Sequence, residues 1–328
     1  MSIALTQLKN VKIEIPSSEK IRNIILSTLT PLIGLLCFLA FWSLSAPHVK
    51  TSLGDFPGPT QVYTQWNNLI DEHVAEKQRA TDFYIRQDKR NAALLAKDPN
   101  AEIRVRNFTG RPTFFDKITT SLITVLCGFI AATIIAIPIG IVIGLNQRLY
   151  QAFNPLIQIF KPVSPLAWLP LITLVVSAVY TSESPLFSKS FVISMFTVTL
   201  CSLWPTMINT AVGVAGVSKD LINVSRVLRL GWFTHVIKIV LPSAIPMMFT
   251  GLRISLGIAW MVLIAAEMLA QNPGLGKFVW DEFQNGSSDS LSRICVAVLV
   301  IGVIGFMLDR AILLLQTWLN WDKTAIVR

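Results

Sequence analysis

The stretch ITTSLITVLCGFIAATIIAIPIGIVIGL, residues Ile118–Leu145, decides the fold. It contains no Asp, Glu, Lys or Arg, and it is longer than the roughly 20 apolar residues that cross the hydrocarbon core of a bilayer. A second stretch, Ser190–Ser218, is also free of charged residues and similarly long. Both runs predict helices that span a membrane.

The overall composition agrees with this interpretation. Only 14% of the 328 residues are Asp, Glu, Lys or Arg, against about 25% in an average soluble protein. A water-soluble chain needs more charge than this to cover its surface, so we expect lipid to solvate much of the protein. The formal net charge of +9 then indicates membrane topology and not a nucleic-acid partner.

The same criterion, applied along the whole chain, predicts an all-α polytopic membrane protein with six transmembrane helices. The predicted spans are residues 24–46, 118–145, 153–178, 191–212, 243–270 and 291–319. Lys161, Pro162, Pro165 and Pro170 interrupt the third span, while Arg253 and Glu267 lie inside the fifth. Helices in lipid tolerate such breaks when neighbouring helices satisfy the freed carbonyls, so the breaks indicate packing inside a bundle.

These spans divide the chain into five regions. We expect an N-terminal tail at 1–23, a first transmembrane helix at 24–46, an insertion at 47–117, a five-helix core at 118–319 with a loop at 213–242, and a C-terminal tail at 320–328. In the insertion, residues 60–97 read as a helix that follows the turn Phe56-Pro57-Gly58-Pro59. It is expected to be a lid or docking arm, or a solvated helical hairpin that only covers the outer surface.

The positions of the basic residues predict the topology. With the N-terminus inside, the inner tails and loops carry Lys9, Lys12, Lys20, Arg22, Arg148, Lys219, Arg226, Arg229, Lys238, Lys323 and Arg328. We therefore expect both termini to be cytoplasmic and the insertion to lie outside. The apolar run Ile24–Trp42 is longer than the roughly 7–15 residues of a signal peptide. It is expected to be a retained anchor, although Ser43-Leu44-Ser45-Ala46 weakly resembles a cleavage site.

No motif of catalysis or metal binding stands out. The cysteines all fall within predicted spans, where a thiol usually packs as a small apolar group, and the histidines are scattered without metal-ligand spacing. Gly274-Leu275-Gly276-Lys277 lacks the first glycine and the Ser or Thr of a phosphate-binding loop. We therefore expect no enzyme, no metal site and no cofactor bound by this chain, which leaves transport as the favoured function.

The loop between the fourth and fifth spans is the most informative segment. From Ser218 to Gly231 the chain is polar enough to leave the membrane, and Val217, Leu221, Val224 and Leu228 recur at helical spacing. Ser218 can cap this short helix, and Asp220 is placed favourably in its first turn. The other face of the helix presents Asn223, Arg226 and Arg229.

This loop resembles that of ABC importer permeases, in which Glu-Ala-Ala is followed by three residues, Gly, nine residues and Ile-x-Leu-Pro. Anchoring on Ile239, Leu241 and Pro242 places the Glu-Ala-Ala positions at Asn223, Val224 and Ser225, and the glycine position at Arg229. The spacing and the final Ile-x-Leu-Pro match this pattern, whereas other residues stand at the Glu-Ala-Ala and glycine positions. The resemblance implies a helix that docks on the ATPase, with the residues Ser218, Asp220, Leu221, Asn223, Val224, Ser225, Arg226, Leu228 and Arg229. A generic interfacial helix is the alternative.

Five further stretches resemble permeases of the nitrate, bicarbonate and sulfonate importer group, the tryptophan-rich ones above all the nitrate branch, and the long outer insertion resembles that of proteobacterial nitrate permeases. The five stretches are KPVSPLAWLP (161–170), SLWPTMINTA (202–211), FTGLRI (249–254), AAEML (265–269) and KFVWD (277–281). The resemblance implies a type I ABC importer permease fold and a homodimer in the bacterial inner membrane. It also implies cytoplasmic ATPase subunits that use ATP and Mg²⁺, and a periplasmic binding protein that delivers the anion.

The resemblance implies a small oxyanion as the substrate, most simply nitrate or nitrite, with cyanate, bicarbonate and sulfonates as alternatives. Arg253 is the candidate for the anion pathway, because charged residues at membrane depth mark such pathways by default; it could instead pair with Asp309 on the sixth span. Glu267 is expected to be a structural partner or a gate, and Trp204 and Trp260 are candidate lining residues. A stand-alone secondary anion transporter and a membrane scaffold are the alternatives from other classes; no inverted repeat supports the former.

Overall fold

The computed structural model describes residues 18–51, 54–98, 103, 105–181, 187–287 and 289–319, with backbone only for 18–28. Two compact units divide the chain between Val62 and Tyr63. The predicted tails at 1–17 and 320–328 lie outside the described residues.

The first unit contains one long apolar helix and a small hairpin. Helix α1 runs over Ser18–Ser45, and the short 3₁₀ helix η2 follows at Ala46–His48. Strands β1 (Lys50–Thr51) and β2 (Gly54–Asp55) pair antiparallel, with Lys50 opposite Asp55. The indole N–H of Trp42 donates to the carbonyl of Pro57 at 3.1 Å, which holds the start of the next helix against the end of α1.

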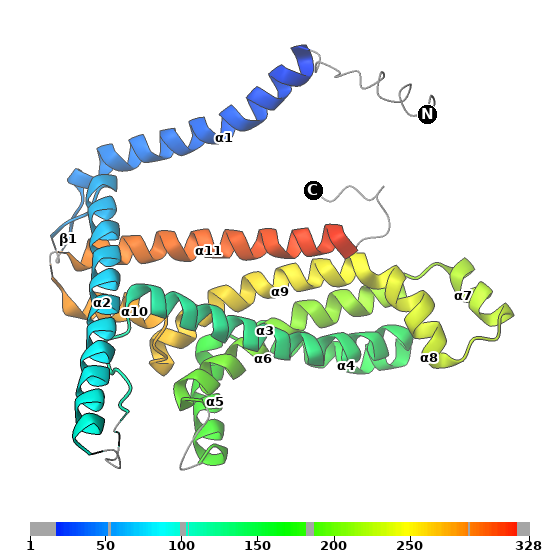
Figure 1. Ribbon diagram of the computed structural model, residues 1–328. Coiled ribbons are helices and arrows are strands. Elements are labelled where there is room, and N and C mark those ends of the chain that lie inside the picture. Colours follow the sequence, from blue (N-terminus) through cyan, green and yellow to red (C-terminus); the bar gives the residue numbers. More distant parts are fainter. Residues whose placement is uncertain are drawn as a thin grey trace, which may run out of the picture. The chain divides into compact units, whose positions relative to one another are not determined.

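The second unit is a bundle built around α6. Helices α3 (Phe114–Leu145) and α9 (Leu241–Ala270) pack along α6 (Lys189–Ala215), and α11 (Ser290–Leu319) packs on α9 (Figure 1). At one end of the bundle, α7 (Lys219–Val227), α8 (Trp232–His235) and the π-helical turn η3 (Val236–Val240) connect α6 to α9. At the other end lie α10 (Leu275–Asn285) and α2 (Pro59–Lys97).

The predicted third span is not a straight helix. In its place the structure has α4 (Gln147–Phe160) and α5 (Pro165–Val179), which are bent by 98° at the break between them. Pro162 and Pro165 lack the N–H groups that a continuous helix needs, and Ser164 begins a new helix by accepting from the Leu166 N–H. The described residues therefore contain 5 helices long and apolar enough to span a membrane, or 6 if the bent pair counts as one span.

Small residues let the bundle helices approach closely. A Cβ added at Gly140 of α3 would stand 2.8 Å from the carbonyl of Met207 on α6, and one at Gly251 of α9 would stand 3.0 Å from that of Pro205. Ser255 reinforces the second contact, since its hydroxyl donates to Ser202 O and accepts from the Thr206 N–H. Lipid supplies no hydrophobic force between helices, so such close packing and buried hydrogen bonds hold the bundle together.

The insertion folds as a helix with an extended return segment. Side chains of α2 accept from backbone N–H groups along that segment: Gln87 from Arg106, Tyr84 from Phe108, and Glu76 from Arg111. Because the return segment has no strand partner among the described residues, these side chains satisfy its backbone. The observed α2 agrees closely with the helix predicted over 60–97.

Two glycines of α9 provide a matched test of the close contact with α6. Gly251→Ala should lower the free energy of unfolding by about 1–3 kcal/mol, because the added methyl group meets backbone that cannot move aside. Gly257→Ala should be neutral or slightly stabilising, since nothing lies within 4 Å of its Cβ position. Thermal unfolding of the two purified variants in detergent measures the difference, and equal melting temperatures would contradict this account of the packing.

Candidate functional site

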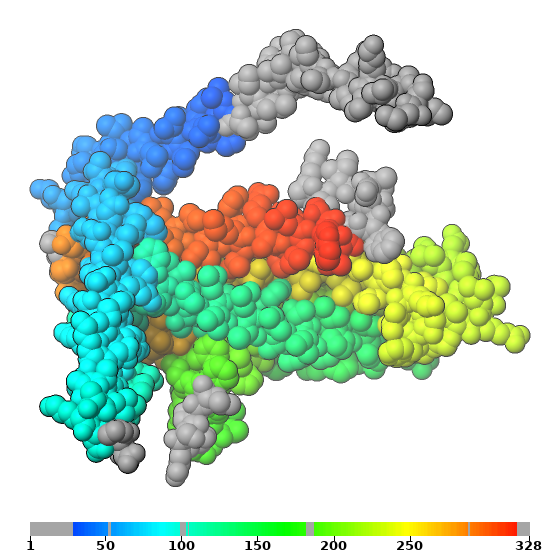
Figure 2. Space-filling view, viewed as in Figure 1, coloured from blue at the N-terminus to red at the C-terminus, as the bar shows by residue number. Residues whose placement is uncertain are grey.

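Helix α7 lies beyond the end of the α3, α6 and α9 bundle (Figures 1 and 2). Ser218 caps it, as the sequence predicts: its hydroxyl oxygen accepts from the Leu221 N–H at 3.4 Å, and Asp220 lies in the first turn. Short helices are marginal on their own, so the cap and the packing of Ile222 on the apolar cluster around Val240 fix α7 in place.

The end of α7 carries a left-handed residue. Arg229 has φ 45°, a conformation in which a side chain is unfavourable and glycine is preferred. The Leu230 N–H donates to Ser225 O, and the Arg229 N–H donates to Arg226 O, which is the hydrogen-bond pattern of a glycine-type helix end. Arg229 thus occupies the backbone position for which the permease loop pattern uses glycine.

The apolar face predicted for α7 points away from the rest of the chain. Leu221, Val224 and Leu228 are exposed, Leu228 at 62%, and the neighbouring Val227 is 82% exposed. Asn223, Arg226 and Arg229 are exposed as well, so that Ser225 is the buried member of the predicted docking set. Within the protein, Val217, Ile222 and Ser225 make the contacts that hold α7 to the bundle, and the rest of the predicted apolar face stays open.

A side-chain hydrogen bond connects α7 to the segment that follows. His235 Nδ1 lies 2.8 Å from Ser225 Oγ, and His235 ends α8 immediately before η3. Ser225 and His235 are ten positions apart, and no local pattern in the sequence predicts that their side chains meet.

The predicted pathway residue Arg253 is paired. Its Nε lies 2.5 Å from Asp309 Oδ1, and its Nη2 lies 3.0 Å from Asp309 Oδ2. This two-point contact joins α9 to α11 within the apolar part of the bundle and leaves the arginine side chain 37% exposed. It is the pairing that the sequence offered as the alternative to a free cationic site.

Glu267 lies in a fully buried corner between α3, α9 and α10. Its carboxylate accepts from the Ser121 hydroxyl at 2.8 Å and from the Gly276 N–H at 3.0 Å. Ser121 in turn accepts from the Leu275 N–H. A Cβ at Gly274 would stand 2.1 Å from the Glu267 carboxylate, so only glycine fits the loop that wraps this group. The contacts match those of a structural partner.

The two predicted lining tryptophans have separate surroundings. Trp260 is 6% exposed and donates to the carbonyl of Ile301 at 3.0 Å, while Trp204 stacks on Phe160 with 6.1 Å between ring centroids. Arg253 and Glu267 lie about four helical turns apart on α9. The structure therefore does not bring the four predicted pathway residues into one cluster.

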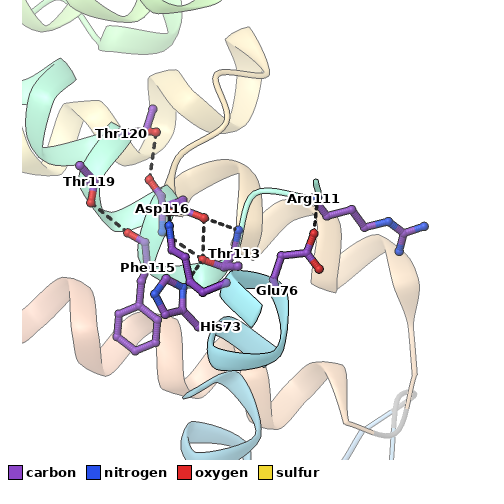
Figure 3. A network of polar contacts seen from close by, with 9 residues as sticks. His73, Glu76, Arg111, Thr113, Phe115, Asp116, Thr119 and Thr120 are labelled. Carbon is purple, nitrogen blue, oxygen red and sulfur yellow. Dashed lines mark hydrogen bonds and ion pairs between the residues drawn. The ribbon is translucent and has the colours of Figure 1, made fainter. Parts of the chain in front are cut away.

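The opposite end of the bundle carries a polar network (Figure 3). His73 Nδ1 on α2 lies 2.7 Å from Thr113 Oγ1, and the Thr113 hydroxyl donates to Asp116 Oδ2 at 2.7 Å. Beside it lies a cavity of about 400 Å³. Both acidic and basic side chains line it, among them Glu76, Glu282, Lys117 and Arg293. Arg293 pairs with Glu72 and Glu282, so this end is held together by ion pairs.

No metal centre accompanies these polar groups: among the described residues, no three or more His, Cys, Asp or Glu side chains are arranged to hold a metal ion. The described residues form several helices long and apolar enough to span a membrane. Residues 136–320 match the family of binding-protein-dependent transport system inner membrane components, and this chain belongs to that family.

Several relatives are permeases of anion importers. The bicarbonate transport system permease protein of Synechococcus elongatus is 34% identical over 89% of this chain and 89% of its own length. The nitrate import permease protein of Synechocystis is 37% identical over 61% of this chain and 68% of its own length. A solved structure of the MetNI methionine ABC transporter aligns with 60% of this chain at 15% identity and a TM-score of 0.49.

The family membership settles the broad class. The chain is the permease component of a nitrate- or bicarbonate-type ABC importer, and not an enzyme, a stand-alone secondary transporter or a scaffold.

Because the end of α7 is strained, substitution by glycine should have opposite effects on hydrogen exchange at two neighbouring positions. Arg229→Gly should slow hydrogen exchange of the last α7 amides by about five-fold, because glycine accepts positive φ without the roughly 1 kcal/mol penalty of a side chain. Arg226→Gly should speed exchange by a similar factor, since it lies inside the helix. Faster exchange in Arg229→Gly would show that the turn is not strained.

The ion pair between α9 and α11 predicts a pattern among three variants. Arg253→Met leaves Asp309 unpaired at membrane depth, and should cost about 2 kcal/mol of stability. Asp309→Leu should cost a similar amount. The double variant should recover most of the loss, because no unpaired charge remains. Melting temperatures in detergent measure the coupling, and strictly additive losses would rule out a stabilising pair.

Proposed function

We propose that this chain forms the membrane pathway of an ATP-driven nitrate importer, and that ATP is hydrolysed with Mg²⁺ on a separate cytoplasmic subunit that docks on α7. The observation that carries the proposal is the protruding α7, whose apolar face is exposed and whose end adopts the glycine-type conformation at Arg229. An exposed apolar patch rimmed by charged residues marks a protein contact.

The charges support an orientation with α7 in the cytoplasm of a bacterial inner membrane. Arg148, Lys219, Arg226, Arg229 and Lys238 lie on the elements at the α7 end of the bundle, as expected for a cytoplasmic face. Helix α11 also ends on that side, which agrees with a cytoplasmic C-terminus.

The opposite end, formed by α2 and α10, would then face the periplasm and receive a soluble binding protein. A second copy of the permease would complete the pathway. The exposed apolar faces of α5 and α11 leave room for such a partner as well as for lipid.

Nitrate is the proposed substrate because the tryptophan-rich stretches of the core resemble nitrate permeases, and because a nitrate import permease is 37% identical over 61% of this chain. Bicarbonate is the second candidate, since a bicarbonate permease matches over 89% of the chain. Both are small, planar, singly charged oxyanions, but bicarbonate also carries a hydrogen-bond donor. A pathway for either needs only weak positive potential, so that the anion can leave as well as enter.

Transport by the reconstituted complex tests this proposal. The chain, its ATPase and its binding protein in proteoliposomes should accumulate labelled nitrate when ATP is present, and excess bicarbonate should not compete. Arg226→Glu together with Arg229→Glu should abolish uptake, because reversed charges disfavour docking, whereas Lys at both positions should retain it. Accumulation of bicarbonate in place of nitrate would contradict the proposed substrate. Normal uptake by the Glu variant would contradict the proposed docking of the ATPase on α7.

A further inference from the structure

Ser225 is the inward-facing member of the docking helix. It is 5% exposed, whereas the other residues predicted to dock on the ATPase are exposed. Its hydroxyl faces His235 Nδ1 at 2.8 Å, and its carbonyl accepts from the Leu230 N–H. One residue thus holds both ends of the turn that reverses the chain after α7.

That turn is a weak mechanical connection by itself. It contains the left-handed Arg229 and then Gly231, which caps α8 through its carbonyl without a side chain. Backbone rotation at Leu228–Gly231 could therefore allow α7 to be displaced without moving α8. The Ser225–His235 hydrogen bond bypasses the turn, because it joins α7 directly to the last residue of α8.

From His235 the connection to the transmembrane core is short. The next residues form η3, in which the Leu241 N–H donates to Val236 O, five residues back. Pro242 has no N–H to donate to the carbonyl of Lys238, which favours this wider turn over a regular helix. Val236 and Val240 are buried, so η3 is anchored in the core while Ser225 and His235 hold its outer end. Single π turns inside helices are often found at functional sites.

We propose that Ser225 and His235 are positioning residues that fix α7 to the beginning of α9, so that displacement of α7 moves α9 and the Arg253–Asp309 pair. This inference rests on the proposed docking of an ATPase on α7. Arg253 lies about 18 Å along the α9 axis from Leu241. Rigid connections of this kind can transmit small shifts into a rearrangement of packed helices.

The experiment separates coupling from folding by measuring ATP hydrolysis and uptake together. In proteoliposomes with the ATPase and the binding protein, anion uptake per ATP hydrolysed should fall about five-fold in Ser225→Ala, as expected when one stabilising hydrogen bond is lost. Thr250→Val is the matched control, since it removes only an exposed hydroxyl bonded to Pro246 O within its own helix. It should couple like the wild type.

Two substitutions at His235 test the geometry of the hydrogen bond. His235→Asn places an amide nitrogen near the position of Nδ1 and should preserve most of the coupling, whereas His235→Gln places it near Nε2 and should not. Coupling that is normal in Ser225→Ala, or equal in the Asn and Gln variants, would overturn the inference. A wild-type chain that neither binds an ATPase nor transports would overturn the proposed function instead, so the two failures are distinguishable.

Discussion

The close approach of α3, α6 and α9 is the constraint on which the remaining structure depends. Glycines at the contacts and the Ser255 hydrogen bonds to Ser202 and Thr206 allow backbones to touch where lipid offers no hydrophobic gain. Helices packed in this way move as a body and do not deform independently. A transport protein can use such a body as a lever, provided that one end is held by a moving partner. Helix α7 is the part of the described chain placed to be held.

Charge is distributed unevenly along this body. One end is basic and protrudes, the other is held by the ion pairs of Arg293, and between them the charge of Arg253 is matched by Asp309. Because Asp309 compensates the charge of Arg253, this pair presents no free cation within the bundle. The carboxylate of Glu267 is buried and accepts hydrogen bonds from Ser121 and Gly276.

The sequence predicted the elements that depend on local composition. Long uncharged runs identified α3 and α6, and the cap at Ser218 identified the beginning of α7. What it could not supply were contacts between distant residues: Ser121 meets Glu267 across 146 positions, and nothing local marks either as a partner of the other. The apolar spacing of α7 was visible in the sequence, but which of its apolar side chains stay exposed depends on how Val217 and Ile222 pack on the bundle. The prolines indicated a break in the third span. They could not show that the break separates two sharply bent helices, α4 and α5, because one kinked helix would have the same composition.

Site-directed cross-linking between α7 and the ATPase subunit tests the central claim most directly. A cysteine introduced by Val227→Cys, in a variant whose four native cysteines are replaced by serine or alanine, stands on the exposed face of α7. The account predicts that a short thiol cross-linker captures the ATPase from this position, and that it does not do so from Tyr84→Cys on α2 at the opposite end of the bundle. Capture from Tyr84→Cys but not from Val227→Cys would contradict it.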